Sequence, residues 1–532
     1  RMGQTFTSTV GTIEVKPDQV RYIDDIKRNG HVFSDGCGKI SHSLAEKAIK
    51  RYWDKRDVID KEIPSVYQIR FRGCKGVVAI DKELEGDVLC IRPSQRKFES
   101  YELYTLEIAK TVKAPQQGHL NRQIILLLSN LKIPDSAFLE LQNNHQSFIE
   151  SMMQDSKRAA EVIRQTSRDR SHQTRTILEM LKAGLMDEEE PFLEAMLEVK
   201  KLFTLKDLKN KARIKVPSTF LLMGVMDETG ILEPDQIYVQ TSTIMSEHQR
   251  GKKSAKGTPC DISVLWAVDV PELSHLRNCI VFSQNGDSPV VNSMAGGDLD
   301  GDEFFVSFDG RLIPTETYES LDYDALPRKE LDRPVNIYDI AEFFRDFMEN
   351  DRLGTICNNH LTLADQKDLG IFSPECIELA IKASMAVDFN KTGVPVTGRL
   401  PTSQKSPDFM ENQTKIKYES QKILGKLYRN IDLNEHRDNE KRYYRKFPIR
   451  PFDRFVEDGY IEYIDDALAQ RDSYNQEVRN LMQRYKIKSE PEVFAGSLLS
   501  VKTCGRHLYD VRDAIASEMA IRITHYRRIF KK

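Results

Sequence analysis

The stretch from residue 296 to 305 constrains this chain more than any other. It reads Gly296-Gly297-Asp298-Leu299-Asp300-Gly301-Asp302-Glu303-Phe304-Phe305. In extended backbone, alternate side chains point the same way, so the three aspartates can converge. At ~4 Å a like-charge pair costs roughly 1 kcal/mol in water and about 4 kcal/mol at an effective dielectric of 20. A folded protein therefore keeps such a cluster most easily by binding a cation.

The flanks of the aspartates favour a loop that is anchored in the fold. The paired glycines allow a tight turn and the close approach of another backbone or a ligand. The apolar run at 304–308 predicts a buried strand that would hold the loop. A solvated acidic loop is the alternative interpretation. A calcium EF-hand is excluded, because it needs Gly at the sixth loop position and Glu at the twelfth, where this chain has Glu303 and Asp309.

The chemistry of the cluster indicates which cation it would take. Carboxylate oxygens with no Cys or His nearby suit a hard ion, so we expect Mg²⁺ or Mn²⁺ rather than zinc. The eight cysteines lie far apart and form no Cys-x-x-Cys pair, so neither a zinc ribbon nor a thioredoxin motif is indicated. We expect them to be free thiols, as in a nuclear or cytoplasmic protein.

Size and composition set broad limits. A chain of 532 residues predicts two to four domains. The net charge is only -3, so binding to nucleic acid would need local basic patches. The longest apolar run, Ile124 to Leu128, is far shorter than the ~20 residues of a membrane span. We recognise no signal peptide and therefore predict an intracellular protein with no membrane partner.

Hydrophobic periodicity divides the chain into alternating β and helical parts. Residues 1–115 predict short strands and one helix at 41–55 that Ser41 caps. The strands are expected at 66–71, 76–80, 88–91 and 103–108. Helical spacing follows at 120–131, 137–153 and 157–182. A second β part is expected at 212–216, 220–225, 237–240, 264–270 and 279–283. From residue 330 onward the predicted helices are 336–351, 374–388, 413–428 and 455–483.

Two basic segments admit two interpretations each. The helical segment 157–182 carries many Lys and Arg residues, and the segment 441–446 mixes basic and aromatic side chains. Both could contact a nucleic-acid backbone or its bases. Both could equally be solvated, charged surfaces.

The aspartate motif also resembles a known family. Asp298-Leu299-Asp300-Gly301-Asp302 is similar to the Asp-x-Asp-Gly-Asp signature of the cell-encoded, RNA-silencing type of RNA-dependent RNA polymerase. The multi-subunit DNA-dependent RNA polymerases carry a related motif. Further matches follow in family order at Arg1-Met2-Gly3-Gln4, Phe33-Ser34-Asp35-Gly36, Gln68-Ile69-Arg70, Lys75-Gly76, Leu120-Asn121-Arg122-Gln123, Ala267-Val268-Asp269-Val270-Pro271 and Ala386-Val387-Asp388-Phe389-Asn390-Lys391-Thr392-Gly393. The chain begins inside the first of these motifs, so we expect a fragment whose upstream part is missing.

The resemblance implies a specific α+β architecture. It consists of two double-psi β-barrels joined by a helical connector, followed by a mainly helical C-terminal neck and head. The implied parts are a first barrel at 1–115, a connector at 116–212, a second barrel with the aspartate loop at 213–310, a neck at 311–440 and a head at 441–532. Periodicity alone does not name this topology.

The resemblance also implies an activity. The chain would copy single-stranded RNA into double-stranded RNA from NTPs, by two-metal nucleotidyl transfer, with silencing-pathway proteins as further partners. Asp298, Asp300 and Asp302 would hold the catalytic ion. Lys75 and Lys97 are the positions that match the lysines of the first barrel. Weaker candidates for phosphate, ribose or template contacts are Arg70, Arg92, Asn121 and Gln123.

One departure from the family pattern keeps alternatives open. The segment Pro259-Cys260-Asp261-Ile262-Ser263 is shorter than the corresponding family segment, which normally contains a His-Pro-Gly-Asp-like sequence. An inactive RNA-binding or scaffold module of the same fold is therefore one alternative. A DNA-templated RNA polymerase of the same barrel architecture is another.

Overall fold

The computed structural model describes most of the chain. The described residues are 8–55, 62–100, 104–112, 114–166, 172–242, 262–316, 318, 327, 329–412, 414–433, 458–499 and 506–530. The chain forms two compact units, one of Arg1–Ala137 with Lys215–Ile423 and one of Phe138–Ile214 with Leu424–Lys532. Among the helices in the described ranges, none has the length and the apolar run that crossing a membrane requires.

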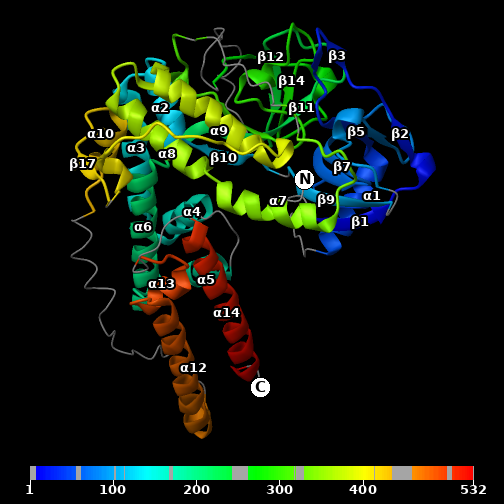
Figure 1. Cartoon of the computed structure of the whole chain (residues 1–532). Helices are drawn as coiled ribbons and strands as arrows, with labels where there is room; N and C mark the ends of the chain where they lie inside the picture. The colour runs from blue at the N-terminus through cyan, green and yellow to red at the C-terminus, as the bar shows by residue number, and fades with distance from the viewer. Residues whose placement is uncertain are drawn as a thin grey trace. The chain divides into compact units, whose positions relative to one another are not determined.

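The first sheet lies in the first unit and has seven strands (Figure 1). Its order is β1 (Val10–Glu14), β9 (Thr105–Thr111), β6 (Val66–Phe71), β7 (Cys74–Asp81), β5 (Cys37–Ser41), β8 (Leu89–Ile91) and β2 (Val20–Tyr22). Helix α1 (His42–Asp54) follows β5, and the Ser41 side chain accepts the Leu44 N–H, which confirms the predicted N-cap. A two-stranded ribbon of β3 (Lys27–Arg28) and β4 (His31–Val32) precedes β5.

The second sheet carries the aspartate loop. Its path is β10 (Gln116–His119), β11 (Lys215–Met226), β14 (Cys279–Phe282), β12 (Gln236–Gln240) and β13 (Trp266–Ala267), and β15 (Glu303–Ser307) pairs with β11. The predicted strand after the aspartates is confirmed as β15. It runs antiparallel to β11, with Phe304 opposite Leu222. Strand β13 is shorter than the predicted 264–270.

A shared core joins the two sheets of the first unit. One buried cluster contains Phe33, Cys37, Val66, Val77 and Ala79 from the first sheet region together with Leu222, Val225, Cys279, Val281 and Leu299 from the second. Burying each large aliphatic side chain stabilises the fold by roughly 1.5–3 kcal/mol. The shared core therefore fixes the positions of the two sheets relative to each other. A separate cluster packs α1 against the first sheet.

The rest of the first unit is mainly helical. Its helices are α2 (Arg122–Asn130), α7 (Ile337–Asn350), α8 (Leu353–Gln366) and α9 (Pro374–Thr392). The predicted helix at 413–428 is wrong in its first part, where residues 416–418 form strand β17 (Ile416–Tyr418) against β16 (Lys405–Pro407), whereas its last part lies in α10 (Ile423–Asn430). The hydroxyl groups of Tyr418 and Ser420 both donate to Asp365, at 2.6 and 2.7 Å, and hold this segment away from helical geometry.

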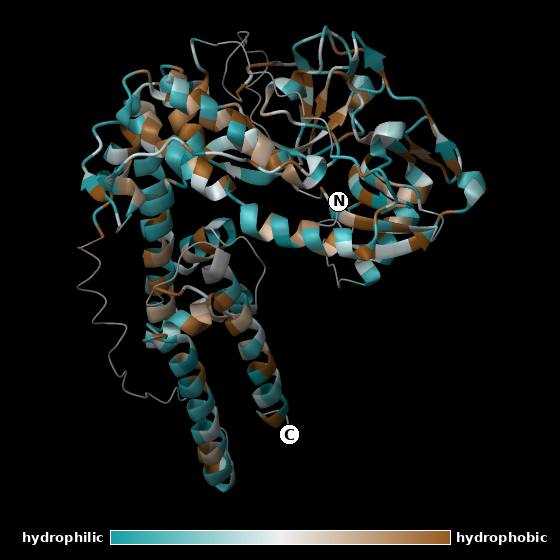
Figure 2. Cartoon of the chain, viewed as in Figure 1, coloured by the Kyte–Doolittle hydropathy of each residue, from teal (hydrophilic) through white to brown (hydrophobic). Residues whose placement is uncertain are grey.

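The second unit is built from helices. Beside α3 (Asp135–Glu150), which begins in the first unit, its helices are α4 (Ser156–Thr166), α5 (His172–Lys182), α6 (Pro191–Lys211), α10 (Ile423–Asn430, from the unit boundary), α12 (Ile464–Tyr485), α13 (Glu490–Ala495) and α14 (Arg506–Phe530). The predicted 157–182 helix appears as α4 and α5, and residues between them lie outside the described part. Helix α12 is mostly hydrophilic along its length (Figure 2). The basic segment 441–446 and the motif at residues 1–4 also lie outside the described residues.

Candidate functional site

The aspartate loop brings its three carboxylates together. One oxygen from each of Asp298, Asp300 and Asp302 lies within 4.8 Å of the others. Leu299 between them is 1 % exposed and belongs to the shared core. The three carboxylates therefore converge as predicted, although the loop bends at residues 299–301 instead of running as extended backbone. The Asp298 N–H donates to Asp302 Oδ2 and the Asp300 N–H donates to Asp298 Oδ1, at 3.1 and 3.2 Å.

Two lysines of the first sheet region face Asp300. Lys75 Nζ, at the start of β7, donates to both carboxylate oxygens of Asp300 at 2.8 and 2.9 Å. Lys97 Nζ lies 3.6 Å from Asp300 Oδ2 and donates to the Ser94 carbonyl at 3.0 Å. The structure thus brings the two lysines matched from the family to the aspartate loop. Their roles in catalysis stay predictions.

The carboxylates differ in their protonation equilibria. Burial and the charges of Asp300 and Asp302 raise the pKa of Asp298 to about 7. Burial also acts to raise the pKa of Asp300, but the ammonium groups of Lys75 and Lys97 outweigh it and hold that pKa below its usual value. The two lysines therefore favour the charged form of Asp300, whereas burial and the neighbouring carboxylates disfavour the charged form of Asp298.

A tight turn at Asp35 and Gly36, in the first sheet region, packs against the aspartate loop. The Leu299 N–H donates to the Asp35 carbonyl at 2.9 Å, and Gly36 lies directly against Asp300. Gly36 has φ of 84°, and a Cβ there would lie 2.4 Å from Asp300 Cβ. Only glycine combines this backbone conformation with this contact. Burial raises the pKa of the Asp35 carboxyl, which also senses Lys97 and Asp300.

Asp25 organises that turn. Its Oδ1 accepts the Ser94 hydroxyl at 2.6 Å and its Oδ2 accepts the Ser94 N–H at 3.0 Å. The Ser94 hydroxyl oxygen also accepts the Gly36 N–H at 3.0 Å. Since the Ser94 carbonyl holds Lys97, one carboxylate orients both the lysine and the glycine turn that touch Asp300.

Two further residues contact the aspartates, Lys391 and Gln68, and neither was a candidate site residue from the sequence. Lys391, near the end of α9, lies 3.7 Å from Asp298 Oδ2 and 3.3 Å from Asp388 Oδ1. Gln68 on β6 donates from Nε2 to the Asp300 carbonyl at 3.3 Å. Both belong to segments that match the family, which is the signal that could have found them. Their convergence on the aspartates depends on long-range folding.

The two candidate arginines lie in different environments. Arg70 pairs with Lys75 across β6 and β7, and burial lowers its pKa while Asp300 opposes that shift. Arg92 is 3 % exposed, and its guanidinium donates to both oxygens of Glu228 at 2.8 and 2.9 Å. Its position inside an ion pair favours a structural role, tying β8 to the loop after β11.

The remaining candidates lie on α2. Asn121 is the N-cap of α2, and its side-chain oxygen accepts the Ile124 N–H at 2.8 Å. Gln123 is exposed and lines a cavity of about 810 Å³ whose wall also includes Asp302. The wall is largely apolar, with Phe282, Phe304 and other side chains of the second sheet. Asn121 therefore has a capping function, and Gln123 shares a cavity with the third carboxylate.

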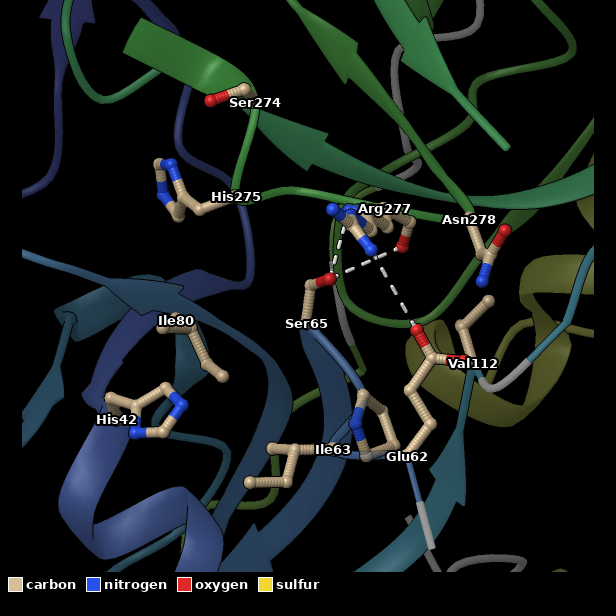
Figure 3. A pocket seen from close by; sticks show the side chains of 11 residues that line it. His42, Glu62, Ile63, Ser65, Ile80, Val112, Ser274, His275, Arg277 and Asn278 are labelled. Atoms are coloured by element: carbon tan, nitrogen blue, oxygen red, sulfur yellow. Dashed lines mark hydrogen bonds and ion pairs between the residues drawn. The ribbon is translucent and has the colours of Figure 1, made fainter. Parts of the chain in front are cut away.

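A second cavity, of about 250 Å³, lies between the two sheets of the first unit (Figure 3). Its polar lining groups bond to one another: Arg277 donates its N–H to Ser65 Oγ at 2.8 Å and its guanidinium lies 3.9 Å from Glu62. His275 Nδ1 lies 3.1 Å from the backbone carbonyl oxygen of Glu272. The contacts of Arg277 with Ser65 and Glu62 link the two sheet regions.

The donor set at the aspartate loop fits a hard divalent cation. Three carboxylates supply oxygen ligands, and their 4.8 Å spread is close to the diameter of a Mg²⁺ coordination shell, about 4 Å. Three convergent carboxylates could therefore hold such a cation, and two lysines from the first sheet region face the same loop.

Comparisons with known proteins identify the family of the chain. The family model described as RNA dependent RNA polymerase matches residues 1–431, and the model described as RdRP, head domain, matches residues 452–532. The chain belongs to the RNA-dependent RNA polymerase family.

Individual relatives show how far the similarity extends. The rice protein named "Probable RNA-dependent RNA polymerase 1" is 38 % identical over 98 % of this chain and 70 % of its own length. "RNA-dependent RNA polymerase 6" of Arabidopsis thaliana is 36 % identical, over 100 % of this chain but only 46 % of its own length. The solved structure of RNA dependent RNA polymerase QDE-1 from Thielavia terrestris has a TM-score of 0.65 at 18 % identity, covering 90 % of this chain and 60 % of that chain. This last likeness concerns the fold alone.

Proposed function

We propose that the chain is the catalytic region of an RNA-dependent RNA polymerase that copies single-stranded RNA into double-stranded RNA for RNA silencing. The observation that carries the proposal is the convergence of Asp298, Asp300 and Asp302 opposite Lys75 and Lys97. Family membership over residues 1–431 supports it. The substrates are NTPs and an RNA template, and proteins of the silencing pathway are further partners in the nucleus or cytoplasm.

The cofactor of this proposal is Mg²⁺ or Mn²⁺, held by the three aspartates. When bound, such ions lower the pKa of the attacking 3′-hydroxyl and offset the charge on the triphosphate. The chain's own residues position the reactants, which is the larger part of catalysis in phosphoryl transfer. Lys75 keeps Asp300 charged and in place, and Lys75 and Lys97 present ammonium groups to the phosphates. Arg70 is a further candidate for a phosphate contact, and Gln123, which lines a cavity with Asp302, is a candidate for a ribose or template contact.

The finer architecture is part of the proposal. The two sheets correspond to two double-psi β-barrels with the site between them, which is the arrangement that the family resemblance implies. The linear division into barrel, connector, barrel, neck and head goes with it. Support comes from the two sheets with their shared core and from the fold likeness to a solved polymerase.

The test is incorporation of labelled NTP on a single-stranded RNA template with Mg²⁺. The wild-type chain is compared with Asp300→Ala and with Asp287→Asn, an exposed acid outside the site. We expect template-dependent product from the wild type and from Asp287→Asn, and none from Asp300→Ala. Thermal unfolding of the three proteins separates loss of chemistry from loss of fold.

Other outcomes distinguish the alternatives. Bound RNA without product from any variant would favour the RNA-binding module. A preference for DNA over RNA in template competition would favour the DNA-templated polymerase. Product that survives in Asp300→Ala would refute the site assignment.

A further inference from the structure

Lys391 is the cation that faces Asp298. It lies on the last turn of α9, which ends at Thr392 because Gly393 adopts φ of 74° and returns its N–H to Phe389. Its Nζ is 3.7 Å from Asp298 Oδ2 and 3.3 Å from Asp388 Oδ1, one helical turn earlier. The site is thus contacted by positive charge from α9 as well as from the first sheet.

Lys391 is held much more loosely than Lys75. The side chain of Lys391 is 58 % exposed, whereas that of Lys75 is 22 % exposed and donates two short bonds to a buried carboxylate. The Lys391 end of its pair with Asp298 is open to solvent and the 3.7 Å separation is longer than the contacts of Lys75, so Lys391 can leave Asp298 at a lower cost than Lys75 can leave Asp300. Lys75 cannot leave Asp300 without stranding a buried charge.

A cation at the triad would compete with Lys391. Both need the same carboxylate of Asp298, and two positive charges about 4 Å apart repel each other strongly at the dielectric of a protein surface. The ammonium group would then turn away while Asp388 keeps it at the edge of the site. In this position the ammonium group of Lys391 would favour contact with an anionic ligand bound beside the cation.

We propose that Lys391 is a further catalytic residue, the counter-ion of Asp298 before the cation binds and a contact for the nucleotide triphosphate afterwards. This rests on the proposed function. In the reaction the 3′-oxygen bonds to the α-phosphorus and its proton passes to water. The bond from the α-phosphorus to the bridging oxygen breaks, and pyrophosphate leaves with that electron pair. The ammonium group of Lys391 offsets the charge that gathers on the pyrophosphate.

Lys391→Gln should strengthen the binding of the metal ion and weaken the binding of the nucleotide. Without nucleotide, Mn²⁺ measured by electron paramagnetic resonance should bind about fivefold more tightly, because a competing charge is gone. The KM for NTP should rise about tenfold or more, because a charge-assisted contact is lost. Lys382→Gln is the matched control, since Lys382 lies on the same helix and pairs with Glu378 at 2.6 Å. Lys391→Arg should restore the KM.

The two measurements test the counter-ion role and the phosphate contact of Lys391 separately. Unchanged or weaker Mn²⁺ binding in Lys391→Gln would overturn the counter-ion role. An unchanged KM would overturn the phosphate contact, as would an equal rise in the Lys382→Gln control. If the wild type incorporates no nucleotide, the proposed function fails. The Mn²⁺ titration and the binding of a non-hydrolysable NTP analogue then still test Lys391.

Discussion

Replacing Gly36 by alanine should disable the site without removing any functional group. Gly36 has φ of 84°, and an added Cβ would lie 2.4 Å from Asp300 Cβ and 2.7 Å from Asp300 Cα. Carbon atoms pack at about 3.5–4.0 Å, so one of the two loops must retreat by about 1 Å. Both contacts on Asp300 are to atoms on or next to the backbone, so a side-chain rotation cannot relieve them.

Two effects of the Gly36→Ala substitution lower the free energy of unfolding. The left-handed backbone costs an alanine about 1–2 kcal/mol. Overpacking of a fixed contact adds about 1–3 kcal/mol. We therefore expect the free energy of unfolding to fall by roughly 2–5 kcal/mol. A catalytic group displaced by about 1 Å can lower turnover about 100-fold, so activity should fall even where the protein stays folded.

Gly30→Ala is the matched control. Gly30 has nearly the same backbone conformation, with φ of 83°, but no heavy atom lies within 4 Å of its added Cβ. It should lose only the backbone term and keep its activity. Urea unfolding gives the stability of both variants, and Mn²⁺ binding with NTP incorporation gives the state of the site. Equal losses in the two variants, with activity kept in both, would refute the close-contact argument.

Three further predictions follow from the same contacts. Lys75→Met should strand the buried charge of Asp300, lowering the free energy of unfolding by about 3–5 kcal/mol. The double variant with Asp300→Asn should regain part of that loss in urea unfolding, and no regain would contradict the pairing. Asp25→Asn should lower kcat about tenfold with little change in thermal unfolding, because it loosens the turn that orients Lys97; an unchanged kcat would argue against this positioning role. Because burial and its neighbours raise the pKa of Asp298 to about 7, that carboxyl holds a proton below this pH, which Mn²⁺ must displace. Affinity for Mn²⁺ should therefore fall as the pH drops from 8 to 6 and level off above 8, and a flat profile would count against the assignment.

Local chemistry explains what could be predicted from the sequence. Strand β6 was predicted at its observed bounds, 66–71, because its alternation reflects one buried and one less buried face. Ser41 was predicted as an N-cap because that role depends only on neighbouring residues. The helix predicted at 413–428 was wrong in its first part, because Asp365, far away in the chain, bonds Tyr418, which lies in a strand. Local propensity carries no information about such a partner.

The candidate site likewise combines features that follow from the local sequence with features that depend on the tertiary structure. The sequence by itself determined that Asp298, Asp300 and Asp302 could converge, since period-two alternation and adjacent glycines are properties of a few consecutive residues. Only the tertiary structure decided what surrounds them. Lys75 and Lys391 reach the loop from segments more than 80 residues away, because the shared core holds the two sheets against one another and α9 ends beside the loop. Which carboxylate is charged follows from these long-range neighbours and from burial, and neither can be obtained from the order of residues alone.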